Sequence, residues 1–300
     1  MKKYSRRLDI LTKKTLVFYP GCIMQTEQYS YEISLREILP VLDIKLVDVE
    51  GFSCCGEPLK SVNRMITLVL SARNIALAES RNLDIFTPCP ICNLAFRECK
   101  NILDNDDKIK EKVNGFLAEE GLTYNGISKV IDLLELLYDI VGLDYIKKHV
   151  KKPLDLKAAV HYGCHAIRPS EIGRSDDSEE PRKIEDILEV LGVEAPWYPE
   201  KLDCCGGLLN MNLPETALTK TGEKLRSIQE QGFDLLVDIC PWCHRQFDSK
   251  QKKSGETVAY SLNLPVVYLT QLMGLAFDIP WGKLGFNLNL SPVNTLVEGR

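Results

Sequence analysis

The sequence lacks the features that mark several common classes of protein. No run of residues approaches the ~18 consecutive apolar positions that a membrane-spanning helix needs. The formal net charge is only −5, so the basic excess typical of nucleic-acid-binding proteins is missing. The basic residues 1–14 contain no apolar core of the kind found in secretory signals. We therefore expect no membrane span and no nucleic-acid partner, and we interpret residues 1–14 as a flexible or partner-docking arm.

The cysteine content argues against an extracellular protein that is stabilised by disulfides. Eleven cysteines occur in 300 residues, which is an odd number in a chain much larger than the small secreted domains that depend on disulfides. Apolar residues make up 45% and charged residues 26% of the chain, as in ordinary globular proteins. The sequence therefore predicts a cytoplasmic protein in a reducing compartment, where the thiols are free to bind metal.

Ten of the cysteines form one pattern that occurs twice. Each copy has a single cysteine, then an adjacent pair followed by glycine, and then a Cys-Pro-x-Cys motif; the gaps span 31 and 33 residues in the first copy and 39 and 34 in the second. The first copy comprises Cys22, Cys54, Cys55, Cys89 and Cys92. The second copy comprises Cys164, Cys204, Cys205, Cys240 and Cys243. Because thiolates are the soft ligands that hold iron–sulfur clusters, zinc or copper, the pattern predicts two similar metal sites in two similar halves.

Strands and helices are expected to alternate in the same order within both halves. The expected strands that lead into cysteine motifs cover residues 15–19, 83–87, 158–162 and 233–239. The expected helices cover residues 32–42, 61–80, 182–191 and 215–231. This alternation predicts an α/β fold with two small, mainly parallel sheets flanked by helices, and it places the cysteines just after the strands.

The duplication also suggests how the chain divides into domains. We expect an N-terminal arm at 1–14, a first cysteine-rich domain at 15–150, a second at 151–279 and a C-terminal arm at 280–300. The polar stretch 171–185 lengthens the first gap of the second copy and is expected to be a solvated loop.

Five cysteines in each half fit a polynuclear metal core better than a single zinc ion. A structural zinc takes four ligands, whereas adjacent cysteines chelate one ion poorly and a fifth thiol is left over. Neighbouring thiols can instead bind neighbouring irons of a cluster. Thiol–disulfide exchange at the two Cys-Pro-x-Cys motifs is a further alternative, but it uses only four of the cysteines. Zinc and exchange chemistry therefore remain alternatives to iron–sulfur clusters.

The doubled pattern resembles the cysteine-rich CCG domains in the B subunit of heterodisulfide reductase. Residues 163–169 and 268–276 are also similar to that protein, and the resemblance covers residues 15–277. The gap after each cysteine pair is slightly shorter than in the usual family pattern. Related CCG proteins of glycolate, lactate and glycerol-3-phosphate oxidation commonly carry a ferredoxin-like Cys-x-x-Cys-x-x-Cys-x-x-x-Cys-Pro run. This sequence lacks that run, so it resembles the stand-alone B subunit.

The resemblance implies an oxidoreductase that acts on sulfur–sulfur bonds. In the family, each CCG motif holds a non-cubane 4Fe-4S cluster through five cysteines, so each copy of the pattern would hold one cluster. The implied function is that of a catalytic subunit that reduces, or reversibly forms, a disulfide such as the coenzyme M–coenzyme B heterodisulfide of methanogenesis. The implied partners are a ferredoxin-like C subunit, a flavin-containing A subunit, and a small disulfide or thiol substrate. A non-catalytic electron-transfer subunit or zinc-stabilised scaffold is the alternative.

Two clusters match the electron requirement of a disulfide. Cleavage needs two electrons, whereas an iron–sulfur cluster usually passes one at a time. The two sulfurs of a disulfide lie only about 2.05 Å apart, so two centres that act on them must lie close together. We therefore expect the halves to pack about a pseudo-twofold axis with the substrate between their clusters.

Three residues near the second set of cysteines are candidates for other roles. His165 and His244 directly follow cysteines, and a histidine that titrates near neutral pH is a candidate proton relay. Either ring could instead hydrogen-bond sulfur or backbone. Arg168 is a candidate anchor for an anionic substrate group, with an ordinary ion pair as the alternative. Three further residues are expected to be structural: Cys99, His149 and His161.

Overall fold

The computed structural model describes residues 14–172 and 175–297, and it contains one four-stranded sheet in each half. The N-terminal sheet has the order β2-β1-β3-β4, from β1 (Lys14–Phe18), β2 (Ile44–Asp48), β3 (Ile85–Phe86) and β4 (Val130–Ile131). The C-terminal sheet has the order β6-β5-β7-β8, from β5 (Leu156–His161), β6 (Val193–Glu194), β7 (Leu235–Asp238) and β8 (Val266–Tyr268). Every pair of neighbouring strands is parallel. The predicted α/β fold with two mainly parallel sheets is therefore confirmed.

Helices connect the strands and cover the sheets. The α-helices of the N-terminal half are α1 (Gly21–Met24), α2 (Tyr29–Val41), α3 (Arg64–Glu79), α4 (Pro90–Leu103), α5 (Asp107–Leu117) and α6 (Leu143–His149). Those of the C-terminal half are α7 (Cys164–Ile167), α8 (Lys183–Val190), α9 (Pro214–Glu230), α10 (Pro241–His244), α11 (Gln251–Thr257), α12 (Leu269–Ala276) and α13 (Asn294–Val297). The 3₁₀ turns are η1 (Glu57–Leu59), η2 (Ala118–Glu120), η4 (Ser170–Ile172), η5 (Gly207–Met211), η7 (Trp281–Lys283) and η8 (Phe286–Leu288). Two segments are π-helical: η3 (Glu135–Val141) and η6 (Arg245–Ser249).

Local sequence explains where the elements that carry the cysteines begin. All four residues of β7 are buried, as expected for a parallel strand that is covered on both faces. Pro90 and Pro241 occupy the first turns of α4 and α10, where proline loses no helical hydrogen bond. Asn63 begins α3 by accepting hydrogen bonds from the backbone amides of Met65 and Ile66. Each Cys-Pro-x-Cys motif therefore lies at the junction between a buried strand and a helix.

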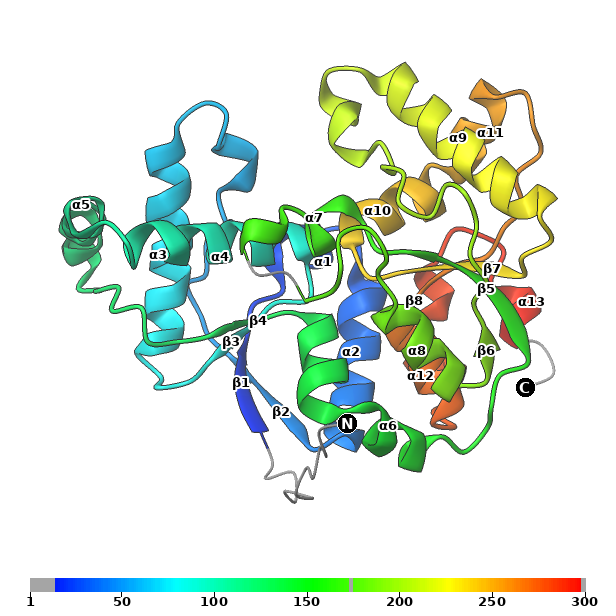
Figure 1. The fold of residues 1–300 in the computed structure, drawn as a ribbon, viewed down its shortest axis with the longest axis horizontal. Coiled ribbons are helices and arrows are strands. Elements are labelled where there is room, and N and C mark those ends of the chain that lie inside the picture. The colour runs from blue at the N-terminus through cyan, green and yellow to red at the C-terminus, as the bar shows by residue number, and fades with distance from the viewer. Residues whose placement is uncertain (1–13, 173–174, 298–300) are drawn as a thin grey trace, which may run out of the picture.

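The two halves share a continuous apolar core. Figure 1 shows α2 between the two sheets and close to α12, and these two helices pack against each other. The shared core includes Leu16 and Phe18 of β1 together with Val160 of β5, all of which are buried. The hydroxyl groups of Ser34 and Thr270 also meet at 2.6 Å in this buried interface. The halves therefore form one body around α2 and α12.

The structure corrects three expectations about elements. Helix α2 begins at Tyr29, three residues before the expected start. Helix α5 was not expected, although its apolar positions Ile109, Val113 and Leu117 are spaced by four residues and Asp106 caps it. Helix α11 was also not expected.

The expected solvated loop 171–185 is more ordered than its composition suggests. Asp176 accepts hydrogen bonds from the backbone amides of Arg182 and Lys183, at 2.9 and 2.8 Å, where α8 begins. Glu185 belongs to α8, is 9% exposed and forms an ion pair with Lys201. Paired charges explain why this polar sequence folds against the body.

The ends of the chain are only partly described. The expected N-terminal arm lies outside the described residues except for Lys14, which begins β1. Residues 280–297 form η7, η8 and α13, and Leu284, Phe286 and Val293 are buried in the shared core. The expected domain boundaries stay predictions. No helix among residues 14–172 and 175–297 is both long and apolar enough to cross a membrane.

Candidate metal centres

The five predicted cysteines of each half gather at the carboxyl end of its sheet. We call Cys22, Cys54, Cys55, Cys89 and Cys92 the first site. We call Cys164, Cys204, Cys205, Cys240 and Cys243 the second site. In both sites the single cysteine lies in a short helix after the central strand, and the Cys-Pro-x-Cys motif begins a helix after the next strand. Parallel strands that end at one edge bring these loops together.

Within each site the thiols lie in the same spatial series. In the first site, each thiol is in hydrogen-bonding contact with the next along the series Cys22, Cys54, Cys55, Cys92 and Cys89. In the second site, the series is Cys164, Cys204, Cys205, Cys243 and Cys240. All ten are free cysteines. The structure therefore brings together the residues that the sequence pattern predicts.

Crowding of the thiols perturbs their acidity. The hydrogen bond from Cys22 lowers the pKa of Cys54, and the hydrogen bond from Cys164 lowers the pKa of Cys204. The same contacts, together with burial, raise the pKa of Cys22 and Cys164. Neighbouring thiolates repel each other, so five of them require a positively charged core. This donor set fits a bound metal cluster.

The backbone around each site leaves room for sulfur rather than for side chains. Gly21 and Gly163 have φ values of +74° and +77°. A Cβ atom on Gly21 would lie 3.0 Å from Sγ of Cys92, and one on Gly163 would lie 3.3 Å from Sγ of Cys243. Glycine is therefore needed here both for its left-handed backbone and for the close approach of a thiol.

The glycine of each Cys-Cys-Gly turn serves a second purpose. The backbone amide of Gly56 lies 3.5 Å from Sγ of Cys54, and that of Gly206 lies 3.3 Å from Sγ of Cys204. These N–H donors stabilise negative charge on sulfur. Each turn therefore places two thiols side by side and directs a backbone N–H group toward one of them.

A single zinc ion fits this arrangement less well. Zinc in a structural site takes four ligands in a tetrahedron, whereas five thiols in series leave one unused. Among the described residues, one compact trio of candidate ligands contains His161, Cys205 and Cys243, whose ligand atoms lie within 4.8 Å of one another. Only the second site has a histidine at this position, because the corresponding residue of the first site is Tyr19. The shared feature of the two sites is thus the five thiols.

The two sites lie against each other through reciprocal contacts. Helix α1, which carries Cys22, packs against α10 of the second site, and α7, which carries Cys164, packs against α4 of the first. Figure 1 shows α1, α7 and α10 gathered where the halves meet. Trp242, between the cysteines of the second motif, packs against the apolar clusters that contain both sets of cysteines. The single-cysteine helix of each half thus lies against the Cys-Pro-x-Cys helix of the other half.

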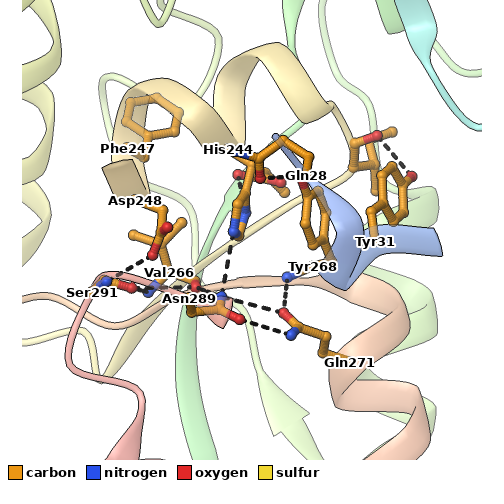
Figure 2. Close-up of polar contacts among 12 residues, drawn as sticks. Gln28, Tyr31, His244, Phe247, Asp248, Val266, Tyr268, Gln271, Asn289 and Ser291 are labelled. Carbon is orange, nitrogen blue, oxygen red and sulfur yellow. Dashed lines mark hydrogen bonds and ion pairs between the residues drawn. The ribbon is translucent and has the colours of Figure 1, made fainter. Parts of the chain in front are cut away.

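Tyr31 joins the two cysteine motifs directly. Its hydroxyl donates to the carbonyl oxygens of Ile239 and Pro88, at 2.8 and 3.3 Å, and these residues immediately precede Cys240 and Cys89. The Tyr31 ring stacks on Tyr268 with centroids 4.0 Å apart. Figure 2 shows these rings next to each other, with His244 on the far side of Tyr268. The sequence pattern contains no signal for this link.

Access to the thiols differs along each series. Cys22 and Cys204 are exposed, whereas Cys89 and Cys240 are buried. A pocket of about 360 Å³ beside the first site is lined by Tyr19, Cys22, Gln25, Phe52 and Cys54, among others. By contrast, a pocket lined by Pro88, Pro90, Ala166 and Ile239, among others, measures only about 10 Å³. A small molecule can thus approach from the side of the exposed thiols.

The structure separates the two candidate relay histidines. Nδ1 of His165 lies 3.2 Å from Sγ of Cys164, so this ring faces the second site. His244 is 1% exposed; its Nδ1 faces Asp238 at 3.3 Å and its ring stacks on Tyr268 with centroids 3.8 Å apart. Although burial opposes it, the Asp238 carboxylate raises the pKa of His244. Figure 2 shows the His244 ring beside Tyr268 and in contact with the side chain of Asn289.

The remaining predicted residues occupy simpler surroundings. Arg168 donates to the carbonyl oxygen of Ser178 at 3.0 Å and is partly buried. Cys99 is buried, and burial raises the pKa of its thiol to about 12. His149 lies against Tyr145 and Phe277. Cys99 is therefore a buried residue, as expected, whereas His149 is half-buried against two aromatic rings.

Sequence reasoning missed the polar residues behind the second site. It assigned His161 a structural role, yet the structure places this ring beside two cysteines. It did not consider Lys224, which contacts His161 from α9. An alignment of the two halves would have drawn attention to His161 and Lys224. It pairs them with Tyr19 and Asn74 of the first half, which are neutral.

Comparisons with known proteins also find one cysteine-rich region in each half of the chain. The CCG family, described as a cysteine-rich domain, matches residues 16–97 and 158–248. The chain is 36% identical over 280 residues to the 8-methylmenaquinol:fumarate reductase membrane anchor subunit of Wolinella succinogenes, covering 93% of this chain and 97% of that protein. It is 34% identical over 278 residues to the B subunit of the ferredoxin/F420H2-dependent CoB-CoM heterodisulfide reductase of Methanosarcina acetivorans, covering 91% and 93%.

The fold is also found among solved structures. A hypothetical protein from Helicobacter pylori superposes with a TM-score of 0.74 at 19% sequence identity. The match covers 93% of this chain and 52% of that one, so the chain spans about half of the longer protein. At this identity the likeness concerns the fold alone.

Proposed function

The chain belongs to the cysteine-rich CCG domain family, and on that premise we propose that it is the disulfide-converting subunit of a heterodisulfide reductase-type complex. Its relatives support the coarser statement that it is a redox subunit with cysteine-rich domains. The finer proposal is that it reduces, or reversibly forms, a sulfur–sulfur bond. The coenzyme M–coenzyme B heterodisulfide is the substrate suggested by the name of the Methanosarcina relative.

Each site would hold one non-cubane 4Fe-4S cluster through its five cysteines. When bound, such clusters supply electrons one at a time. Cleavage of a disulfide R–S–S–R′ consumes two electrons and two protons and yields the thiols RSH and R′SH. Two centres that each pass one electron therefore match the stoichiometry of one substrate molecule.

The observation that carries the proposal is the reciprocal packing of the two sites. Contacts of α1 with α10 and of α7 with α4 bring the cysteine helices of one half against those of the other. Tyr31 spans the residues just before Cys89 and Cys240 through two hydrogen bonds from one hydroxyl. Two centres that worked independently would not require such proximity. The close approach favours joint action on one small molecule.

The residues around the sites suggest how this molecule is handled. A substrate would enter from the side of Cys22 and Cys204, because these are the exposed thiols of the two sites. His165 is the better candidate proton donor, since it faces Cys164, whereas His244 is engaged with Asp238. Arg168 would anchor an anionic substrate group. These roles remain part of the proposal.

A second candidate function has a specific observation in its favour. The Wolinella relative, at 36% identity, is named as part of a fumarate reductase. A chain of this kind would relay electrons through the same two sites without acting on sulfur. A zinc-stabilised scaffold would have the same fold without iron.

Two experiments separate these candidates. After anaerobic purification, about eight irons and eight sulfides per chain are expected for two 4Fe-4S clusters, whereas one or two zincs without sulfide would contradict the proposal. Electron paramagnetic resonance spectra of the oxidised protein are then compared with and without coenzyme M and coenzyme B. A changed signal indicates that substrate sulfur reaches iron, and an unchanged signal at full iron content favours the relay.

The proposal also includes the partner subunits of the chain. Electrons would arrive from a ferredoxin-like C subunit through the cytoplasmic complex, which would also contain a flavin-containing A subunit. Co-purification of the tagged chain from its native host is expected to recover an iron–sulfur protein and a flavoprotein in equal amounts with it.

A further inference from the structure

A buried cation lies behind the second site. Lys224 of α9 is 3% exposed. Its Nζ atom lies 2.6 Å from the carbonyl oxygen of Glu200, 3.1 Å from that of Asp203 and 2.9 Å from Nδ1 of His161. Residues 200–203 lead directly into the paired cysteines of the second site. Lys224 therefore fixes both the loop that carries these cysteines and the ring of His161.

The contact with Lys224 determines which nitrogen of His161 carries a proton. An ammonium group has three N–H donors and no acceptor, so it donates to Nδ1. Because Nδ1 accepts from the ammonium group, it carries no proton, so the ring is neutral. A neutral ring that accepts at Nδ1 carries its proton at Nε2. His161 is therefore an N–H donor on the side away from Lys224.

This donor is directed toward the sulfurs of the second site. Nε2 of His161 is buried and has no hydrogen-bond partner among the described residues. A Cβ atom on Gly163 would lie 4.0 Å from Nε2 and 3.3 Å from Sγ of Cys243. Ligand atoms of His161, Cys205 and Cys243 lie within 4.8 Å of one another. The sulfurs of Cys205 and Cys243 therefore lie beside the ring as acceptors within reach of this N–H.

The corresponding positions of the first site are recognisable from the duplication. Tyr19 and His161 each precede the single cysteine of their site by three residues. Each ring packs edge-on against a phenylalanine, Phe96 or Phe247, with centroids 4.8 Å apart in both halves. The same comparison relates Asn74 to Lys224.

The helices confirm the match of Asn74 with Lys224. Each residue lies three positions after a hydroxyl side chain that donates to the second cysteine of the pair. Ser71 donates to the carbonyl oxygen of Cys55 at 2.7 Å, and Thr221 donates to that of Cys205 at 2.9 Å.

The first site is neutral where the second is charged. The Tyr19 hydroxyl donates to the carbonyl oxygen of Ser53 at 2.8 Å, so its proton is directed to backbone. Asn74 donates to the carbonyl oxygens of Ser53 and Cys54 at 3.2 Å and accepts from the Ser53 amide at 2.9 Å. Asn74 thus holds the loop as Lys224 does, but without a positive charge.

We propose that Lys224 and His161 are positioning residues that give the cluster of the second site a higher reduction potential than that of the first. The inference rests on the proposed function, since it requires a cluster in each site. A positive charge and an N–H donor both favour the more negative, reduced state of a cluster whose sulfurs they face. The first electron from a one-electron donor would therefore reside at the second site, and the next at the first.

The test is an anaerobic redox titration followed by electron paramagnetic resonance on the full chain. The Lys224→Met variant removes the charge at similar length, and His161→Phe removes the donor while keeping a ring. Each variant is expected to lower the equilibrium constant for one-electron reduction of the second centre about tenfold, which corresponds to about 59 mV. The first centre is expected to keep its potential. Signals are assigned from Cys54→Ala and Cys204→Ala proteins, each of which lacks one centre.

Two further variants separate this effect from general disturbance. Lys220→Met makes the same chemical change on the exposed face of α9, one turn away, and should leave both potentials unchanged. His161→Gln restores an N–H donor and should recover part of the potential lost in His161→Phe. Iron and sulfide content is measured for every variant.

Each result decides between the alternatives. The proposal is overturned if Lys224→Met and His161→Phe contain full iron yet keep the native potential, or if the first centre shifts instead. It is also overturned if both variants lose iron only from the second site, because the pair would then maintain shape rather than potential. Absence of iron from the native protein would refute the proposed function itself, whereas two loaded centres of equal potential would refute this inference alone.

Discussion

The two halves hold five thiols in the same series but surround them with different polar groups. Behind the first site lie Tyr19 and Asn74, which donate to backbone. Behind the second lie Lys224 and His161, which contact each other, and the ring of His161 lies beside two cysteines. The difference teaches that the ligand set and its electrostatic surroundings are separable parts of such a site. On the proposal above, the thiols would fix where a cluster binds, and the residues behind them would set its reduction potential.

The contrast between neutral residues in the first half and titratable residues in the second recurs at the positions that flank the Cys-Pro-x-Cys motifs. Thr87 and Asn93 of the first half correspond to Asp238 and His244 of the second. Burial raises the pKa of Asp238 to about 6, and the pair is enclosed beneath Tyr268. The second half therefore concentrates the titratable groups, whereas the first half has neutral side chains at the same places.

The largest expected effect comes from removing one ligand. Cys54→Ala should remove the cluster of the first site and leave that of the second, so that iron and sulfide fall to about half, because each 4Fe-4S centre depends on its own thiolates. Cys99→Ala is the matched control and should keep full iron, since Cys99 donates to the carbonyl oxygen of Leu68 in the core. Complete loss of iron in Cys54→Ala would show that the two halves do not load independently.

A smaller effect is expected from the glycines that precede the single cysteines. Gly21→Ala and Gly163→Ala should each lower the free energy of unfolding by about 1–2 kcal/mol, because a left-handed backbone disfavours alanine. Gly21→Ala should also lose more iron than Gly163→Ala, since its Cβ atom would approach sulfur to 3.0 rather than 3.3 Å. Chemical denaturation and iron analysis check the order, and equal retention of iron would contradict it.

Alkylation of metal-free protein tests the acidity of the thiols. The pKa of Cys54 is lowered by Cys22 and that of Cys204 by Cys164, so both should react as thiolates already below pH 7, with little gain in rate at higher pH. Cys99, with a pKa raised to about 12 by burial, should stay unmodified until the protein unfolds. Mass spectrometry after brief iodoacetamide treatment at pH 6 and pH 8 measures this. A steep increase in the alkylation of Cys54 between pH 6 and pH 8 would contradict the lowered pKa of this thiol.

The smallest effect concerns Arg168, whose position in the first half is occupied by Thr26. Arg168→Ala should raise KM for an anionic disulfide by about tenfold with little change in kcat, because a lost charge-assisted hydrogen bond costs about 1.5 kcal/mol. Arg182→Ala is the control and should change neither constant, since the Arg182 side chain is exposed and pairs with Asp186 of the same helix region. An unchanged KM in Arg168→Ala would remove this residue from the substrate site.

Much of this arrangement was predictable from the sequence because the cysteine pattern is long, ordered and repeated. Apolar runs that end at cysteines predicted parallel strands, and Pro90 and Pro241 marked the helix starts. The contacts of Tyr31 with Ile239 and Pro88 were not predictable, because they join positions more than 200 and 50 residues apart, respectively, without a local signal. The role of Lys224 was hidden because an isolated lysine in a helix is usually exposed.

The central claim is that each half encloses an iron–sulfur core through five cysteines and that the two cores adjoin. The most direct measurement is a crystal structure of the anaerobically purified chain, with anomalous diffraction recorded at the iron and zinc edges. The account predicts two iron clusters, each bound by the five thiols of one site, on either side of Tyr31 and Trp242. Zinc in either site, or a site without metal in fully active protein, would contradict it.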